Sequence, residues 1–81
     1  MIVEITAEAE ADLEAIGDYI ARDNTVRAVS FVRELGRSCM DLAEFPEAWP
    51  IVPRYETQSI RRRVHGRYLI FYQIRGDQVT V

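Results

Sequence analysis

The sequence predicts an α+β fold in which an antiparallel helical hairpin packs on one face of a small, mostly antiparallel sheet, in the order β-α-α-β-β-β. Three observations predict this architecture. Apolar residues recur at three- and four-residue steps through residues 7–44, with one break at residues 23–25. Two β-prone runs flank Gly66 between residues 60 and 74. Shorter runs of the same kind lie near the two ends of the sequence.

The N-terminal half is expected to form one strand and two helices. Residues 2–5 (IVEI) are a candidate strand, because Ile and Val favour the pleated conformation. Thr6 is a candidate N-cap for a helix over residues 7–22, since two glutamates follow in its first turn. A second helix is expected over residues 26–44, after the turn-forming Asp-Asn-Thr at residues 23–25. A connection this short makes the two helices an antiparallel hairpin.

The C-terminal half is expected to supply the rest of the sheet. Three prolines make residues 45–58 an irregular loop, in which Trp49 is interpreted as a lid on the core. Strands follow at residues 60–65 and 67–74, and the second is almost unbrokenly apolar, which predicts burial on both faces. After a Gly-Asp turn, residues 78–81 begin a third antiparallel strand.

Size and composition indicate a single domain over residues 1–81 with a thin core. The one cysteine, Cys39, can form no intramolecular disulfide and suits a reducing cytoplasm. The N-terminus lacks the basic and apolar regions of a secretory signal, and no apolar run is long enough to span a bilayer. A cytoplasmic location without a membrane partner is therefore expected.

The net charge of −3 hides a strong asymmetry. Residues 1–50 hold four arginines and eleven acids (4 − 11 = −7), and residues 51–81 hold six arginines and two acids (6 − 2 = +4). An acidic helical part is therefore expected beside a basic sheet part. The two charges either complement each other within the chain or serve a ligand.

No motif for a nucleotide, a metal, a cofactor or a catalytic nucleophile is present, so no catalytic residue is assigned. His65, at a strand end, is interpreted as a surface residue, and Cys39, in an apolar stripe, as a core thiol. Strand alternation puts Arg61, Arg63 and His65 on one face, which is therefore expected to be basic. What remains is a set of basic and aromatic residues on the strands, which suits either RNA or an acidic peptide. These residues are Arg61, Arg63, Arg67, Tyr68, Tyr72 and Arg75.

Several short motifs occur in one order along nearly the whole chain. They are A-x-x-D-L-x-x-I-x-x-Y-I-A at 9–21, D-N-T at 23–25, F-V-x-x-L at 31–35, C-M-D-L-A-E-F-P at 39–46, I-R-R at 60–62, G-R-Y-L-I-F-Y at 66–72 and D-x-V at 77–79. Together they resemble the ParE toxins, in the ParE/RelE superfamily of type II toxin–antitoxin systems.

The resemblance implies a non-enzymatic toxin that inhibits DNA gyrase and is neutralised by a ParD-like antitoxin with a ribbon-helix-helix domain. It implies no cofactor and no specific binding of nucleic acid. An acidic and apolar antitoxin segment is expected to contact the hairpin and the basic strands. The expected contacts are Leu13, Ile16, Ile20, Phe31 and Leu35 on the hairpin, and Arg61, Arg63 and Arg67 on the strands.

Two departures from the family pattern weigh against a nuclease. The family continues past its last strand with an R-I-L-H-G-A-R-D-like segment, which is expected to be missing here because the sequence stops at Val81. The lysines of RelE-like nucleases are absent as well. The alternatives are a RelE-like, ribosome-dependent mRNA endonuclease in which Arg61, Arg63 and Arg67 grip phosphate, or a truncated remnant that only binds antitoxin.

Overall fold

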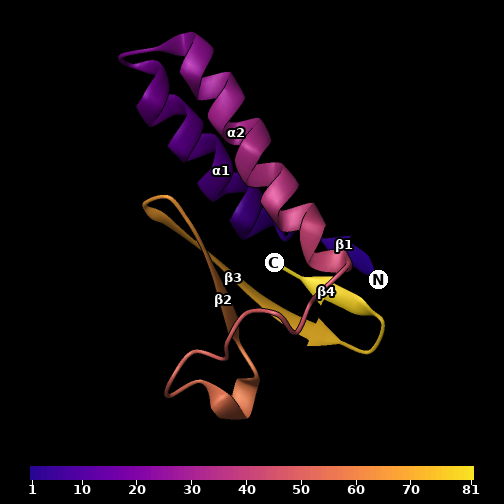
Figure 1. The fold of residues 1–81 in the computed structure, drawn as a ribbon. Coiled ribbons are helices and arrows are strands. Elements are labelled where there is room, and N and C mark those ends of the chain that lie inside the picture. Colours follow the sequence, from indigo (N-terminus) through magenta and orange to yellow (C-terminus); the bar gives the residue numbers. More distant parts are fainter.

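The elements follow one another as the sequence predicts, in a computed structural model that describes residues 1–81 (Figure 1). They are β1 (Ile2–Glu4), α1 (Ala7–Ala21), α2 (Thr25–Met40), β2 (Arg61–His65), β3 (Tyr68–Arg75) and β4 (Gln78–Thr80), with short 3₁₀ turns at Asp41–Ala43 and Glu56–Gln58. The predicted α+β fold with the order β-α-α-β-β-β is confirmed.

Side-chain caps begin both helices. The Thr6 hydroxyl accepts a hydrogen bond from the Ala9 amide (3.2 Å), and the Asn24 side chain accepts one from the Arg27 amide (2.9 Å). The second helix ends at Met40 rather than near residue 44, and the chain continues as a tighter 3₁₀ turn. This turn places Leu42, which is fully buried, in the core.

The sheet has the strand order β1-β4-β3-β2, with β1 parallel to β4 and the other two pairings antiparallel. All of β2 pairs with the first half of β3, whereas β4 pairs only with residues 73–75. The glycines of both two-residue turns, Gly66 and Gly76, have φ of +60°, which an L side chain rarely adopts. Residues 68–72 of β3 therefore have a strand on one side only.

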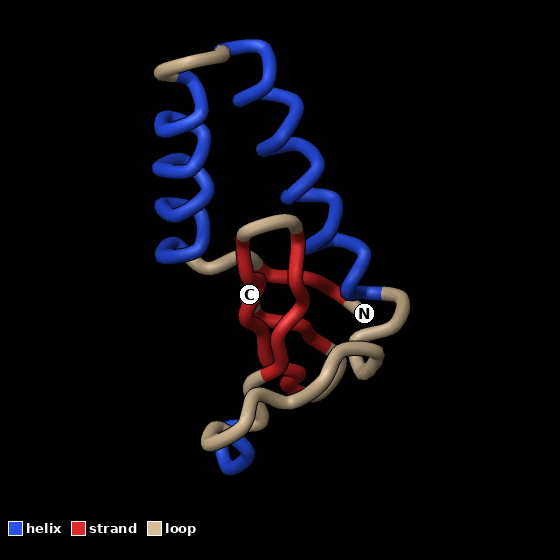
Figure 2. The backbone as a smooth tube through the Cα atoms, turned by 60° about the vertical axis from the view of Figure 1, so that its left-hand side comes forward, coloured by secondary structure: helices blue, strands red, loops and turns tan.

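The core lies between α2 and one face of the sheet. Leu35 and Cys39 of α2 pack with Ile70, Tyr72 and Val79 of the strands. No residue of α1 is fully buried, because this helix packs chiefly on α2. The hairpin extends well beyond the strands, so that the turn between the helices lies far from the sheet (Figures 1 and 2).

The prediction that residues 67–74 are buried on both faces is wrong. Ile70 and Tyr72 point into the core, but Leu69 is 47% exposed and Phe71 is 48% exposed on the opposite face. Strand side chains alternate between the two faces, and both helices of this chain lie on the same side of the sheet. The apolar run is therefore half core and half uncovered surface.

Candidate functional site

An apolar groove runs between α1 and the open side of β3. It has a volume of about 240 Å³. Leu13 and Ile16 of α1 form one wall, Leu35 of α2 contributes to the floor, and residues 68–71 of β3 form the other wall. Val81 also lines it, next to the end of β4. We call this feature the hairpin groove.

The open edge of β3 gives the hairpin groove unpaired backbone groups. In an antiparallel sheet each residue directs both its N–H and its C=O to the same neighbouring strand, and successive residues alternate. The two-residue turns fix the register, so that Tyr68, Ile70 and Tyr72 bond to β2. Leu69 and Phe71 therefore direct their backbone groups toward the groove, and such an edge is a template for an added strand.

The polar rim of the hairpin groove is acidic, because Glu8 and Asp12 of α1 line it together with Thr6. No arginine lines this groove. A segment that fits here presents apolar side chains to the floor, backbone hydrogen bonds to the edge of β3, and basic groups to α1.

The structure brings together only part of the residues that the sequence suggests for antitoxin binding. Leu13, Ile16 and Leu35 line the hairpin groove, with Leu35 almost fully buried. Ile20 and Phe31 do not line it and lie further along the hairpin. Ring contacts with Tyr68 (5.5 Å between centroids) hold the side chain of Phe31.

Two of the three suggested arginines use their guanidinium donors within the chain, Arg63 on the end of α2 and Arg61 on the loop that follows it. The Arg63 guanidinium donates to the Ser38 carbonyl (2.8 Å) near the end of α2 and lies over the Trp49 ring, 4.4 Å from its centroid. Arg61 donates to the carbonyls of Trp49 (2.7 Å) and Glu47 (3.2 Å). These contacts join β2 to the helix and the loop that precede it.

The expected basic surface is therefore divided between different parts of the molecule. Arg67 is exposed in the turn between β2 and β3, and Arg75 lies on the sheet face away from the helices. Tyr72 is in the core, where its hydroxyl donates to the Pro46 carbonyl (2.6 Å). Sequence alternation grouped Arg61 with Arg63 correctly, but it could not show that their side of the strand faces the helices.

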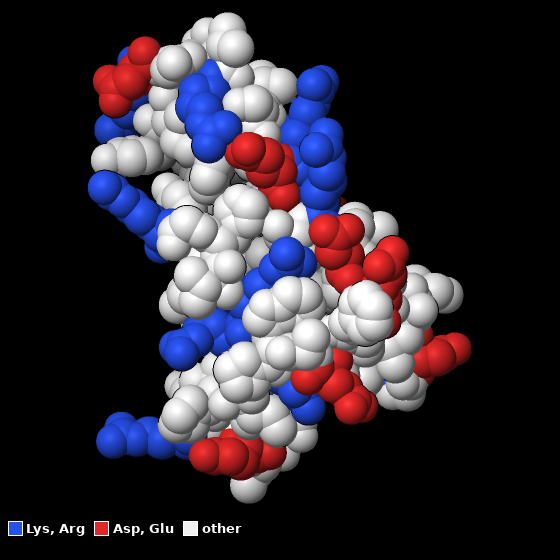
Figure 3. All heavy atoms as spheres, viewed as in Figure 1, with Lys and Arg blue, Asp and Glu red and all other residues white.

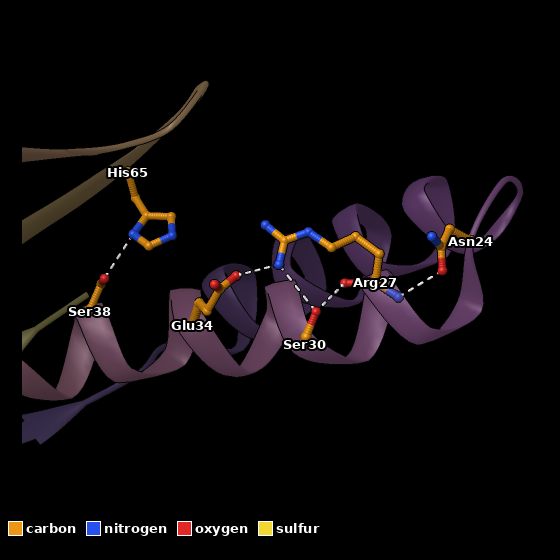
Figure 4. A network of polar contacts seen from close by, with 6 residues as sticks. All are labelled: Asn24, Arg27, Ser30, Glu34, Ser38 and His65. Atoms are coloured by element: carbon orange, nitrogen blue, oxygen red, sulfur yellow. Dashed lines mark hydrogen bonds and ion pairs between the residues drawn. The ribbon is translucent and has the colours of Figure 1, made fainter.

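The interpretation of His65 as a surface residue is incomplete, because its side chain contacts α2. Its Nδ1 lies 2.8 Å from the Ser38 hydroxyl, and its ring makes an edge contact with Phe31 (5.7 Å between centroids). Figure 4 shows this link between β2 and α2. His65 thus fastens the β2–β3 turn to the hairpin.

Cys39 is a buried core thiol, as predicted. Burial raises the pKa of the Cys39 thiol, and the nearby Arg63 charge only partly opposes this effect. A raised pKa leaves little thiolate at neutral pH, so the residue suits packing rather than nucleophilic chemistry. No three His, Cys, Asp or Glu side chains lie close enough together to hold a metal ion.

Ion pairs between acidic helices and basic strands are not formed. The one salt bridge joins Arg27 to Glu34 within α2 (2.8 Å), and both side chains are roughly half exposed (Figure 4). Such a pair contributes at most about 1 kcal/mol to stability. On the face drawn in Figure 3, acidic and basic side chains intermix over the hairpin and the sheet.

One family model matches almost the entire chain. Described as the ParE toxin of the parDE type II toxin–antitoxin system, it covers residues 3–81 and so includes the helices, the sheet and the hairpin groove. The chain belongs to the ParE toxin family. No curated protein matches the sequence. This ParE family member has no helix that is long and apolar enough to cross a membrane.

Proposed function

We propose that this chain inhibits DNA gyrase by binding to it, without catalysis, and that a ParD-like antitoxin neutralises it by docking in the hairpin groove. The observation that carries the proposal is the open edge of β3 beside an apolar groove in a ParE family member. Inhibition by contact needs no nucleophile, which agrees with the raised pKa of the buried Cys39 thiol and with arginines whose donors are used within the chain. The proposed location is the cytoplasm, where gyrase works.

The hairpin groove offers enough apolar surface to order a flexible segment. Leu13 and Ile16 are each only partly buried on α1, a helix that this chain leaves without a fully buried residue. Each large apolar side chain that a partner buries contributes about 1.5–3 kcal/mol. Two or three of them would offset the roughly 2–5 kcal/mol that ordering a disordered segment costs.

The charges around the groove refine the expected antitoxin contacts. Glu8 and Asp12 favour basic residues on the segment that lies against α1. Of the three suggested arginines, Arg67 remains available to acidic residues of the antitoxin, because it is exposed at the end of the β2–β3 hairpin. We assign Arg61 and Arg63 an indirect role, because their guanidinium groups bond to the loop and to α2 within the chain.

A pair of substitutions on α1 tests the groove. Leu13→Asp places a carboxylate in the hairpin groove, and Ala11→Asp places the same group on an exposed position of the same helix that does not line it. Isothermal titration with the paired ParD-like antitoxin should show at least about a 100-fold loss of affinity for Leu13→Asp, since an apolar contact is lost and a carboxylate is buried among apolar side chains. Ala11→Asp should stay within about threefold.

Two assays separate the proposed target from the alternative. Purified toxin should inhibit gyrase supercoiling, and added antitoxin should restore it. Cleavage of mRNA on programmed ribosomes without effect on gyrase would favour the RelE-like endonuclease instead. Equal antitoxin affinity of Leu13→Asp and the wild type would remove the groove from the interface.

A further inference from the structure

A second hollow lies on the sheet face away from the helices. Its volume is about 350 Å³, and it is lined by Val52, Tyr55, Ile60, Arg62 and Phe71. Arg62 and Phe71 are paired across β2 and β3, and strand alternation directs them both away from the core. We call this feature the outer hollow, and neither helix reaches it.

A strained but well-bonded loop forms one side of the outer hollow. Arg54 and Ser59 have φ of +75° and +54°, a conformation that is uncommon for residues other than glycine. Hydrogen bonds from the Val52 amide to the Ile60 carbonyl (2.8 Å) and from the Tyr55 amide to the Val52 carbonyl (3.1 Å) hold the loop in this shape. Backbone strain of this kind clusters at functional sites. The loop presents Tyr55, 48% exposed, at a fixed position.

The strands continue the apolar surface beyond the outer hollow. Val64 and Leu69 form the next cross-strand pair on this face, and they are 61% and 47% exposed. Together with Phe71 and Tyr55 they make an uncovered apolar band, of a kind that marks interaction surfaces on soluble proteins. No element of this chain packs over it.

The charge of the outer hollow selects the chemistry of its partner. Arg62 is the only charged residue in the lining, and no carboxylate lines it. Arg62 takes part in no salt bridge, since the only one joins Arg27 to Glu34. A partner that places a large apolar side chain in the hollow and a carboxylate on Arg62 satisfies both features. Nucleic acid fits less well, because its affinity depends on several cations that neutralise phosphates.

We propose that the outer hollow is the surface with which this toxin holds its protein target. The target segment carries a large apolar side chain next to an acidic residue. The inference rests on the proposed function, in which the antitoxin occupies the hairpin groove between α1 and the edge of β3. Phe71 borders both surfaces, but Arg62 and Val64 line no part of the hairpin groove, so substitutions at these two positions separate binding of the target from binding of the antitoxin.

The test compares Arg62→Glu with Arg75→Glu, a matched charge reversal at an exposed position of β3 that does not line the outer hollow. Three quantities are measured for each variant: growth arrest on induction in cells, inhibition of gyrase supercoiling, and the Kd for the ParD-like antitoxin. Arg62→Glu should need at least about 10-fold more protein for half-inhibition of gyrase and should arrest growth weakly. Its Kd for the antitoxin should stay within about twofold, and Arg75→Glu should match the wild type in all three measurements.

Val64→Ser is a second variant, which removes an apolar contact of the outer face without a change of charge and does not touch the hairpin groove. Circular dichroism checks that both variants fold. The inference would be overturned if Arg62→Glu and Val64→Ser both inhibit as well as the wild type. So would parallel losses of antitoxin affinity and toxicity.

If the wild type arrests growth but leaves gyrase active, gyrase is the wrong target, and the inference stands if Arg62→Glu still abolishes arrest. A wild type that cleaves mRNA, with cleavage lost in Arg62→Glu, would assign the hollow to RNA and overturn it. A wild type that is inert in every assay would overturn both proposals.

Discussion

Replacing Arg63 by alanine should lower the free energy of unfolding by about 2–4 kcal/mol. The side chain makes one hydrogen bond from a charged donor, to the Ser38 carbonyl, and one cation–π contact, with Trp49. Such a hydrogen bond contributes about 1.5–3 kcal/mol and such a contact about 0.5–1 kcal/mol where water still reaches it. Because Arg63 is only half-buried, the two energies are added without an increase for exclusion of water.

Urea unfolding followed by circular dichroism measures this loss. A domain of this size has an m-value of roughly 1 kcal/mol/M, so the midpoint should fall by about 2–4 M if m is unchanged. Arg67→Ala is the matched control, because Arg67 is exposed and makes no side-chain hydrogen bond or salt bridge, and it should stay within about 0.5 kcal/mol of the wild type. Equal midpoints for the two variants would refute the structural role of Arg63. That outcome would return Arg63 to the set of residues free to contact a partner.

The other predictions concern the core, the pH dependence of stability and the helices. Tyr72→Phe removes the hydrogen bond to Pro46 and should cost about 1–2 kcal/mol in the same urea experiment; an unchanged midpoint would mean that the bond contributes nothing. Burial raises the pKa of the Tyr72 hydroxyl above 10.0, so the unfolded chain loses this proton first and stability should fall as the pH rises above that value. The fall should be shallower in Tyr72→Phe, and parallel curves for the two proteins would contradict this reasoning. Gly36→Ala should stabilise α2 by about 0.5–1 kcal/mol, because a Cβ there meets nothing within 4 Å, and a lower thermal midpoint would show an unseen contact. Asn24→Ala should cost about 1 kcal/mol through loss of the helix cap, whereas Asn24→Asp, which keeps the acceptor, should not. Cys39 should react with iodoacetamide at pH 8 only as fast as the protein unfolds, and rapid labelling of the native protein would contradict its burial.

Local sequence signals were sufficient for the secondary structure. Thr6 and Asn24 cap the helices because their side chains accept hydrogen bonds from amides three residues later, which requires no tertiary contact. Gly66 and Gly76 allow the left-handed turns that join three consecutive strands. The predicted end of α2 was less accurate, because burial of Leu42 in the core decides where the α-helix gives way to a 3₁₀ turn.

The sequence by itself determined the order of the elements, the face shared by Arg61 and Arg63, and membership in the ParE family. Only the tertiary structure decided which side of the sheet the helices cover. A strand pattern with a period of two separates the residues into two faces, but β3 is apolar on both, so the pattern does not distinguish core from surface. Packing of α2 settles this choice. It places Arg63 against the end of α2 and leaves Leu69 and Phe71 uncovered. The surfaces available to partners follow from that one packing decision, which depends on contacts between residues far apart in the chain.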